Sequence, residues 1–533
     1  MRQNHLSPAL LCGVAAAVPA ACAAQQGTSG RESGRPNIVY IMTDDHAYQT
    51  VGAYGHPISR LAPTPNIDRL AREGMLFREA FVENSISAPS RATLLTGVYS
   101  HRHGQTTLSY GIMDTTLVHF PELLRAEGYR TAIFGKWHLS VEPKGFDHYD
   151  LLWDQGEYYN PVMRTPETGG RYVRQEGYAT GIITDHALAW LDGHRDDDAP
   201  FCLMIHHKAP HRNWMADLKY LDLYEDVEFP EPETLFDDYA TRGDQMRQQQ
   251  LTIDRHMGYA FDFKVEELKD EPTLQYIHDS WDIAMSTLTP EQRRVWDDSY
   301  GRKNRDFLAD RPEGKELLRW KYQRYIHDYC RTIRSVDDQI GRVLDYLEEN
   351  GLMDNTLIVY TSDQGFLLGE HGLYDKRFMY EESFRTPLIM AWRGHIRPGT
   401  VCRELVQNID YAPTLLDAAG VGVPDGMDGV SLQPLFRSGK ARGWRTSLYY
   451  QYYDYPAVGS VRAHYGIRTD RYKLIHWFGP GADGDPDIDF WELYDLKRDP
   501  CEVHNVYEVR GYLPVRRELT QLLAEKRGEL GIR

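Results

Sequence analysis

The sequence predicts an α/β fold built on a large, mostly parallel sheet that is flanked by helices. Short, continuous apolar runs of strand length recur along the chain, and helical patterns of apolar residues alternate with them. A parallel strand is buried on both faces, so it is apolar along its whole length rather than at every second residue. After Pro434, aromatic-rich segments between turn residues predict a smaller antiparallel sheet.

Four apolar runs are the predicted strands of the large sheet, at residues 37–43, 131–134, 201–205 and 356–361. Helical patterns cover residues 64–73, 120–127 and 316–350. Pro65 at the first turn and Gly74 after the last mark the ends of the first helix, and Gly128 closes the second. The antiparallel strands are predicted within 447–453 and 465–477, and the last helix at 513–529.

These elements predict an α/β domain at 36–440 and a C-terminal subdomain, with a small sheet and a helix, at 441–533. The segment 213–315 is polar, charged and rich in Met and Gln, so we expect a helical or irregular insertion over the sheet face. Because no sequence repeat interrupts this pattern, one large core with one smaller appendage is the simplest organisation.

Residues 1–24 predict a secretory signal peptide, because an Ala-rich apolar run follows Arg2 and ends in a small-residue cleavage pattern. The run is too short for a membrane-spanning helix. Cys22 leaves lipid attachment open as an alternative to simple cleavage. We therefore expect a periplasmic or cell-envelope protein with no stable membrane span.

The composition limits the classes of partner. The 533 residues include 60 Lys and Arg and 78 Asp and Glu, for a formal net charge of −18. A nonspecific nucleic-acid binder needs a basic surface, so this charge argues against one. The four cysteines after the leader are widely spaced and predict neither a zinc site nor a disulfide framework.

Reactive side chains follow each of the four predicted strands. Asp44 and Asp45 follow the first strand, and Asp363 and Gln364 follow the fourth. The second and third strands lead into the segments Gly-Lys-Trp-His at 135–138 and His-His-Lys-Ala-Pro-His at 206–211. Because sites in such sheets form at the carboxyl ends of the strands, we expect these groups to converge. Each alone has an ordinary alternative as a capped turn or a solvated surface group.

Asp44, Asp45, Asp363 and Gln364 predict a site for a hard divalent cation. Three carboxylates and an amide carbonyl form the kind of all-oxygen ligand set that calcium and magnesium prefer. The set contains neither Cys nor His, so it suits zinc less well.

The segment 87–97, Ser-Ala-Pro-Ser-Arg-Ala-Thr-Leu-Leu-Thr-Gly, predicts the start of a helix. Pro89 stands in its first turn and Gly97 ends it, so Ser87 would lie at the positive end of the helix, where an anion is favoured. Arg91, one turn along, could face the same anion. The alternative is that Ser87 only caps the helix.

This segment, S-x-P-S-R-x-x-x-L-T-G, resembles the signature of the type I sulfatases of the alkaline phosphatase superfamily. Gly-Lys-Trp-His at 135–138, Ala-Pro-His at 209–211, Asp-Gln-Gly at 363–365 and Lys376 follow in that family's order, and the resemblance covers roughly residues 36–500. It implies the α/β fold of that superfamily and hydrolysis of a sulfate ester. It also implies that a serine-type maturase oxidises Ser87 to formylglycine, and that the cation is Ca²⁺, with Mg²⁺ less favoured. Gln364 stands where several relatives have Asn, which preserves the carbonyl ligand.

The resemblance also implies roles for the residues. Formylglycine at position 87 would hydrate to a gem-diol, and one of its hydroxyls, in contact with the metal, would attack sulfur. Arg91, Lys136 and Lys376 would hold the sulfate oxygens together with the metal. His211 is the expected acid for the leaving alcohol, and His138 the expected base that leads to release of sulfate, since histidine titrates near neutrality. His207 is expected to be structural.

Three further segments, at 207–214, 373–382 and 461–470, look like the N-acetylglucosamine-6-O-sulfatase branch. The expected substrate is therefore a sulfated carbohydrate, N-acetylglucosamine 6-O-sulfate at the end of a host glycan or glycosaminoglycan. Its expected sugar contacts are Asp375, Arg377 and His464, with Trp214 as an aromatic wall, although each could instead be structural. The net charge of −18 disfavours long-range capture of a polyanion and favours an exo-acting enzyme.

Other functions remain open on the sequence alone. Sulfate and phosphate esters are close in shape, so a phosphomonoester or phosphonate hydrolase on the same fold is one alternative. A sulfatase with another sugar-sulfate specificity is a second. A non-catalytic sulfoglycan-binding protein is the third, if Ser87 remains a serine.

Overall fold

The computed structural model describes residues 34–480 and 487–532. The signal peptide predicted at 1–24 lies outside these residues. Within the described ranges, every helix is too short or too polar to cross a bilayer.

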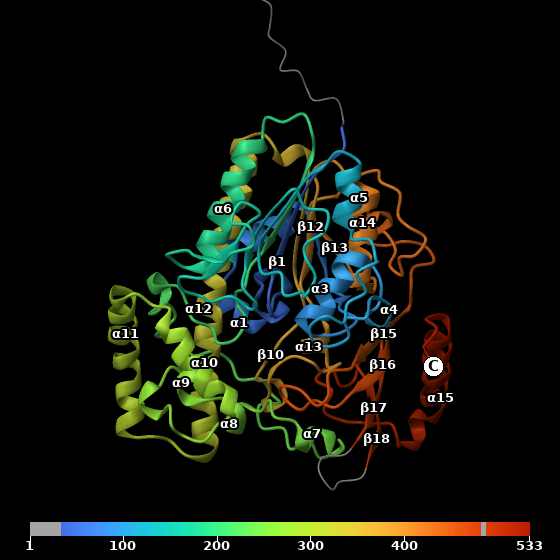
Figure 1. Cartoon of the computed structure of the whole chain (residues 1–533). Helices are drawn as coiled ribbons and strands as arrows, with labels where there is room; N and C mark the ends of the chain where they lie inside the picture. Colours follow the sequence, from blue (N-terminus) through green and yellow to red (C-terminus); the bar gives the residue numbers. More distant parts are fainter. Residues whose placement is uncertain (1–33, 481–486, 533) are drawn as a thin grey trace, which may run out of the picture. The chain divides into compact units, whose positions relative to one another are not determined.

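A ten-stranded sheet is the largest element of the fold (Figure 1). Its five central strands are parallel neighbours in the order β9 (Thr356–Ser362), β1 (Asn37–Thr43), β8 (Phe201–His206), β4 (Arg130–Gly135) and β5 (His148–Leu152). The outer strands are β13 (Thr400–Cys402), β2 (Met75–Phe77) and β12 (Leu388–Ala391) beyond β9, and β6 (Val162–Arg164) and β7 (Val173–Arg174) beyond β5. The prediction of a mostly parallel sheet is confirmed, and all four predicted strands belong to its centre.

Helices cover both faces of this sheet (Figure 1). One face packs against α2 (Pro65–Glu73), α6 (Ala179–His194) and α12 (Gly314–Glu349), and the other against α3 (Ser87–Thr96), α5 (Phe120–Ala126) and α14 (Tyr411–Ala418). The side chains of β1 alternate between the two cores, with Val39 and Ile41 in one and Ile38 and Tyr40 in the other. This double burial explains why the strand is apolar at every position.

The segment 213–315 contains five helices, α7 (Gln245–Gln248), α8 (Ile253–His256), α9 (Tyr259–Phe263), α10 (Gln275–Ser286) and α11 (Pro290–Ala309). Three of them, α8, α9 and α11, contact the long helix α12, and Phe307 of α11 stacks on Trp320 of α12 with ring centroids 3.7 Å apart. Thr289 and Gln292 form a capping box at the start of α11, which fixes where that helix begins.

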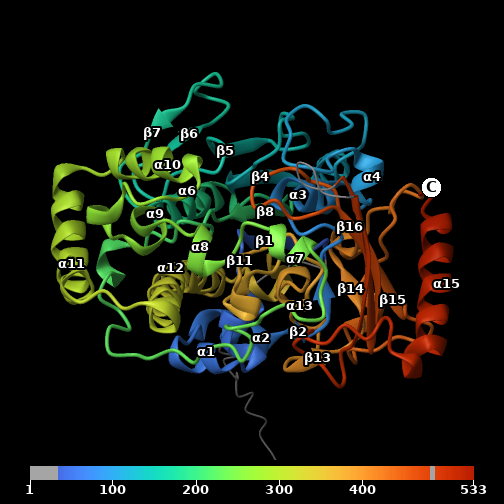
Figure 2. The ribbon, with the colours of Figure 1, turned by 90° about the horizontal axis from the view of Figure 1, so that it is seen from below.

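A second sheet of four antiparallel strands follows, in the order β15 (Ser447–Tyr452), β16 (His464–Thr469), β17 (Tyr472–Gly479) and β18 (Ile488–Asp495). The last helix, α15 (Leu513–Glu529), packs on it through Leu519 and Leu523 (Figure 2). The predicted small sheet and helix are confirmed. The predicted run 465–477 is two strands joined by a tight turn, and β18 was not predicted, because its sequence Ile-Asp-Phe-Trp-Glu-Leu-Tyr-Asp mixes charged and apolar residues.

Backbone hydrogen bonds hold the strand ends of the large sheet at one edge. The amide of Asp363 donates to the carbonyl of Thr43 at 3.1 Å, the amide of His207 to Met42 at 2.8 Å, and the amide of Lys136 to His206 at 2.8 Å. Gly135 makes the hydrogen bond between the Lys136 amide and the His206 carbonyl possible. Its φ is +99°, and a Cβ there would lie 2.0 Å from the carbonyl oxygen of His206, so only glycine fits.

Candidate active site

Ser87 is the first residue of α3, and its side chain points at the sheet edge rather than at its own helix. Ile86 occupies the N-cap position, and no side chain caps the helix. Instead, the Ser87 hydroxyl donates to Asp44 Oδ1 at 3.0 Å. The helix ends at Gly97, whose φ of 67° is typical of a C-terminal glycine. The structure therefore contradicts the alternative in which Ser87 serves only as a cap.

Three buried carboxylates, those of Asp44, Asp45 and Asp363, lie beside Ser87. The backbone amide of Asp45 donates to Asp363 Oδ1 at 3.1 Å. Burial and the neighbouring carboxylates raise the pKa of Asp45 to about 7, although Lys376 opposes the shift. Burial raises the pKa of Asp363 to about 6 as well, and Asp44 adds to the effect. Three acids so close together need added positive charge to be ionised at once.

Gln364 completes this set, and its amide shows that a cation fits. Its NH₂ group donates to Asp45 Oδ1 and lies 3.4 Å from the Ser87 hydroxyl. Its carbonyl oxygen is buried and has no hydrogen-bond partner among the described residues, which is costly. If the side-chain amide rotated by half a turn, this oxygen would face the oxygens of Asp45 and Ser87. Oxygens that face one another in this way require a cation between them. The all-oxygen set therefore fits a hard divalent ion.

His211 also approaches the acidic cluster. Ligand atoms of Asp44, Asp45 and His211 all lie within 4.8 Å of one another, so the imidazole is a further possible ligand. The sequence-based ligand set did not include it. His211 Nε2 is 3.6 Å from Asp45 Oδ2, and its Nδ1 donates to the carbonyl of Arg212 at 2.7 Å.

Each carboxylate has a cationic partner. Lys136 Nζ pairs with Asp44 Oδ2, and Lys376 Nζ lies 2.5 Å from Asp45 Oδ2. The Arg91 guanidinium donates to Asp363 Oδ2 at 3.0 and 3.1 Å. Burial alone would raise the pKa of Asp44, but Lys136, His211 and Arg91 hold it well below its usual range. The structure thus brings the cations expected to hold sulfate and the residues expected to hold metal into one cluster.

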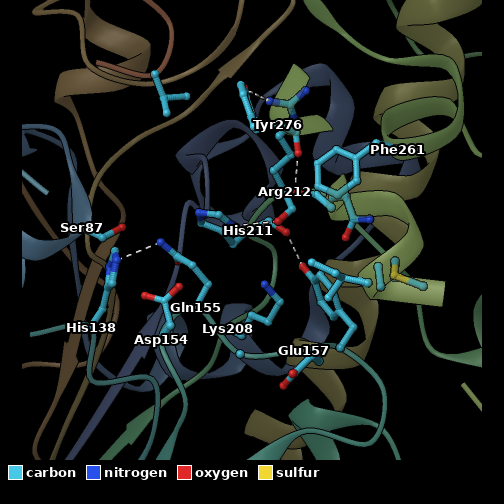
Figure 3. Close-up of a pocket in the computed structure, with 18 of the residues that line it drawn as sticks. Ser87, His138, Asp154, Gln155, Glu157, Lys208, His211, Arg212, Phe261 and Tyr276 are labelled. Atoms are coloured by element: carbon cyan, nitrogen blue, oxygen red, sulfur yellow. Dashed lines mark hydrogen bonds between the residues drawn. The ribbon is translucent and has the colours of Figure 1, made fainter. Parts of the chain in front are cut away.

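Gln155 joins Lys136 to His138 through hydrogen bonds. It was not predicted from the sequence as a residue of the site. Its amide oxygen accepts from Lys136 Nζ at 2.5 Å, and its NH₂ group faces His138 Nε2 at 2.8 Å (Figure 3). An ammonium group cannot accept a hydrogen bond, so the amide oxygen must face Lys136 and the NH₂ must face His138. His138 Nε2 is therefore the unprotonated ring nitrogen. Gln155 follows β5, so its place after a strand was the signal that could have revealed it.

Burial and the charge of Lys136 lower the pKa of His138 well below its usual range. The imidazole is therefore neutral, and its Nε2 electron pair accepts the hydrogen bond from Gln155. His138 also has a φ of 56°, in the left-handed region. Asp45 at 66°, Asp375 at 75° and Arg377 at 91° share this conformation, which is uncommon outside glycine and concentrates at functional sites.

A cavity of about 530 Å³ opens from this cluster (Figure 3). Ser87, His138, His211 and Lys376 line one part of it. The Arg212 side chain, held to Asp262 at 2.6 and 2.7 Å, lines it next to them. An apolar wall is formed by Met215, by Phe261 of α9 and by Tyr276, Ile283 and Ala284 of α10. Trp153, 55% exposed, also lines it. This apolar wall was not predicted from the sequence, because its residues come from distant segments of the chain.

The expected sugar contacts separate into two pairs. Asp375 and Arg377 line the cavity on either side of Lys376. The guanidinium of Arg377 lies 3.5 Å from Asp375, and its Nε and Nη1 atoms have no hydrogen-bond acceptor in the described chain.

The other pair is buried away from the cavity. Trp214 has no exposed surface and packs on Tyr325 with ring centroids 4.6 Å apart, so the prediction that it stacks on a sugar is wrong for this structure. His464 is buried between Trp477, at 4.0 Å, and Tyr450, at 5.5 Å. It does not line the cavity, so a sugar contact would require its neighbours to move. His207 is buried outside the cavity lining, and its amide bonds to Met42.

Two family models match the chain. The sulfatase model matches residues 36–421, and the model of the C-terminal part of N-sulphoglucosamine sulphohydrolase matches residues 369–529. The chain is 44% identical to the N-acetylglucosamine-6-O-sulfatase of Bacteroides thetaiotaomicron over 525 residues, which cover 97% of this chain and 90% of that protein. It is 27% identical to a multifunctional alkaline phosphatase superfamily protein of Trinickia caryophylli, over 91% of this chain and 94% of that protein.

A solved structure of a protein in complex with its substrate D-glucosamine-2-N,6-O-disulfate is also similar. It superposes with a TM-score of 0.86 and 43% sequence identity, over 93% of this chain and 98% of that chain.

The acidic cluster predicts that a divalent cation stabilises the folded protein. After chelation, we expect Ca²⁺ to raise the melting temperature, because an ion that binds only the native state adds about 2.7 kcal/mol at a hundredfold excess over Kd. Asp363→Asn removes the negative charge of one of the ligands and should weaken the Ca²⁺-dependent shift. Asp354→Asn, at a side chain that is 85% exposed, is the matched control and should keep the shift. A wild-type protein whose melting temperature is unmoved by millimolar Ca²⁺ or Mg²⁺ would contradict the prediction.

Proposed function

Because the chain belongs to the sulfatase family, we propose that it hydrolyses the 6-O-sulfate ester of N-acetylglucosamine in host glycans or glycosaminoglycans. Sulfuric ester hydrolysis follows from the family and from 44% identity to an N-acetylglucosamine-6-O-sulfatase. The observation that carries the proposal is the Ser87 hydroxyl bonded to Asp44, among three cation-paired carboxylates at one end of a cavity. The substrate in the similar solved complex carries a second sulfo group, which supports glucosamine 6-sulfates as the wider substrate class.

Two groups would supply chemistry that the unmodified chain lacks. Ser87, oxidised to formylglycine by a serine-type maturase, would provide a hydrated aldehyde as the nucleophile. A divalent cation, Ca²⁺ in our proposal, would be held by Asp44, Asp45, Asp363 and Gln364 and would supply positive charge beside that nucleophile. The residues of the chain then have to hold the sulfate and move two protons.

Lys136, Lys376 and Arg91 would hold the sulfate oxygens. Their carboxylate partners fix all three cations at the Ser87 end of the cavity before the substrate arrives. Charge that is already in place stabilises a developing negative charge without reorganisation. This preorganisation is the main contribution that we assign to the three cations.

His211 would donate the proton to the leaving alcohol. The carbonyl of Arg212 accepts from its Nδ1, so Nε2 is the atom presented to the site. Nε2 carries a proton to donate only when the ring is an imidazolium. Burial lowers the pKa of His211 and Asp44 raises it, so the ring would take up a proton before it acts as the acid. His138 would take a proton at Nε2, the atom that Gln155 keeps unprotonated. A fixed ring orientation supports both assignments, and a fixed tautomer supports that of His138.

Asp375 and Arg377 would bind the hydroxyls of the sugar. They flank Lys376 in the sequence, so a carboxylate and a guanidinium stand next to a group assigned to the sulfate. The apolar wall on α9 and α10 would face the apolar side of a pyranose ring.

The second candidate function is phosphomonoester or phosphonate hydrolysis. The similarity to a multifunctional alkaline phosphatase superfamily protein supports keeping it, since one cation-rich site could hold either anion. We also propose export to the periplasm or cell envelope, on the leader pattern at residues 1–24.

Formylglycine formation predicts a mass change and a loss of activity. In protein from its native host, the peptide that contains Ser87 should be lighter by two hydrogens. Ser87→Ala should lower kcat by roughly 10⁴-fold or more, as expected when the nucleophile of an enzyme is removed. Ser438→Ala, at an exposed serine, is the control and should keep full activity. An active enzyme with unmodified Ser87 would refute this part of the proposal.

The specificity is tested with matched sugar sulfates. Among 6-, 4- and 3-sulfated N-acetylglucosamine and galactose standards, we expect the highest kcat/KM for N-acetylglucosamine 6-sulfate. Aryl sulfate should be hydrolysed faster than the matching aryl phosphate. Preference for a galactose sulfate would overturn the sugar assignment and leave the sulfatase activity intact, whereas faster phosphate turnover would favour the second candidate.

The role of His211 is tested with two leaving groups. His211→Ala should lower kcat for a sugar sulfate about 10²–10⁴-fold, because a sugar alcohol needs protonation to leave. An aryl sulfate has a far better leaving group and should be affected much less. His138→Ala should slow both substrates, since release of sulfate is common to them. Equal losses for the two substrates in His211→Ala would exclude His211 as the acid.

A further inference from the structure

Lys208 places an unpaired ammonium group in the wall of the cavity. It follows β8 in the same loop as His211, and its side chain is among those that line the pocket in Figure 3. The residue is only 5% exposed. Its contact is with the ring of Tyr158, 4.8 Å from Nζ, and within the described chain no carboxylate or other acceptor bonds to it.

The other cations around the cavity are already paired. Lys136, Lys376 and Arg91 each contact a carboxylate of the metal site, and Arg212 forms a two-point pair with Asp262. Arg377 lies next to Asp375. Because a sulfate ester carries a single negative charge, the cations near Ser87 are sufficient for it. The charge of Lys208 therefore exceeds what the 6-sulfate needs.

Burying an unpaired charge costs free energy, and an anionic ligand that pairs with Lys208 would offset that cost. Burial and the nearby charge of Lys136 lower the pKa of Lys208 to about 8, while Asp44 and Glu157 act in the opposite direction. The group still carries its proton at neutral pH. Glu157, which also lines the cavity, is the acid facing it, but the two side chains form no ion pair.

A second unsatisfied donor belongs to the same loop. Asn213 lines the cavity, is buried, and its side-chain NH₂ group has no acceptor in the described residues. Lys208 and Asn213 stand on either side of His211 in the sequence. Both donors line the same cavity, and an ammonium and an amide NH₂ each suit the oxygens of an anion.

We propose that Lys208 binds a second anionic group of the substrate, a sulfo or carboxylate group, and so favours glucosamine 6-sulfates that carry an additional negative charge. This inference rests on the proposed function and adds a specificity determinant to it. The anion can belong to the same sugar, as an N-sulfo group, or to a neighbouring uronic acid. Both present anionic oxygens to Lys208.

The experiment compares substrates within each variant. The three substrates are N-acetylglucosamine 6-sulfate, D-glucosamine-2-N,6-O-disulfate, and a disaccharide in which N-acetylglucosamine 6-sulfate is linked to a uronic acid. In Lys208→Met, we expect kcat/KM for a doubly charged substrate to fall on the order of tenfold or more relative to the monosulfate, the usual size of a hydrogen bond to a charged group. Because the comparison is a ratio within one protein, partial misfolding cancels.

Two further variants control the result. Lys208→Arg keeps the charge and should keep the wild-type ratio. Glu157→Gln removes the facing acid without removing the ammonium, and should leave the ratio unchanged or raise it. A loss in the N-sulfo arm alone assigns the anion to the same sugar, and a loss in the uronic acid arm alone assigns it to the neighbour.

An unchanged ratio in Lys208→Met would overturn the inference, because Lys208 would then serve the 6-sulfate or the fold. Failure of the proposed function would give a different experimental result. In that case the wild-type protein would hydrolyse none of the three 6-sulfated substrates.

Discussion

The mutual repulsion of three buried carboxylates is the constraint on which the site depends. Asp44, Asp45 and Asp363 lie together at the carboxyl edge of the large sheet, out of contact with water. In a medium of low polarity such a group cannot be ionised unless positive charge surrounds it. Lys136, Lys376 and Arg91 supply that charge, and the unsatisfied carbonyl of Gln364 indicates that a cation adds to it. The same cations are thereby fixed where a sulfate would bind.

The parallel sheet makes this concentration of charge possible. Parallel neighbours end at the same edge, so four loops that are distant in the sequence meet within hydrogen-bond distance of one another. Their backbones are constrained there, as the left-handed φ angles of Asp45 and His138 show. The cost of these conformations is offset by the rest of the sheet, in which β1 is buried on both faces.

Global and local charge have different consequences in this protein. The net charge of −18 describes a body that repels a polyanion at long range. The cavity wall around Ser87 is nevertheless rich in cations, and most of them are held by acids of the site itself. Lys208 stands apart from this arrangement because, among residues 34–480 and 487–532, no acid forms an ion pair with it. The cavity thus combines a charge-balanced end, an apolar wall and the ammonium of Lys208.

Local sequence is sufficient to predict the strands of the sheet, the start of α3 at Ser87 and the groups that follow each strand. These depend on local patterns: apolar runs, helix-end residues and the position of a side chain after a strand. The metal ligands and the cations could be predicted together for that reason, since parallel topology alone brings strand ends to one edge.

Which side chains reach the cavity depends on packing between segments, and local sequence does not reveal it. Trp214 and His464 have the residue types of sugar contacts, but they are buried by Tyr325, in the distant helix α12, and by Trp477, opposite His464 on the neighbouring strand. Gln155 and Lys208 look like ordinary polar loop residues until packing places one between Lys136 and His138 and leaves the other without an acceptor. The exposure of a side chain and its ion pairs depend on contacts formed in the folded protein. Strands and motifs depend instead on neighbours in the chain.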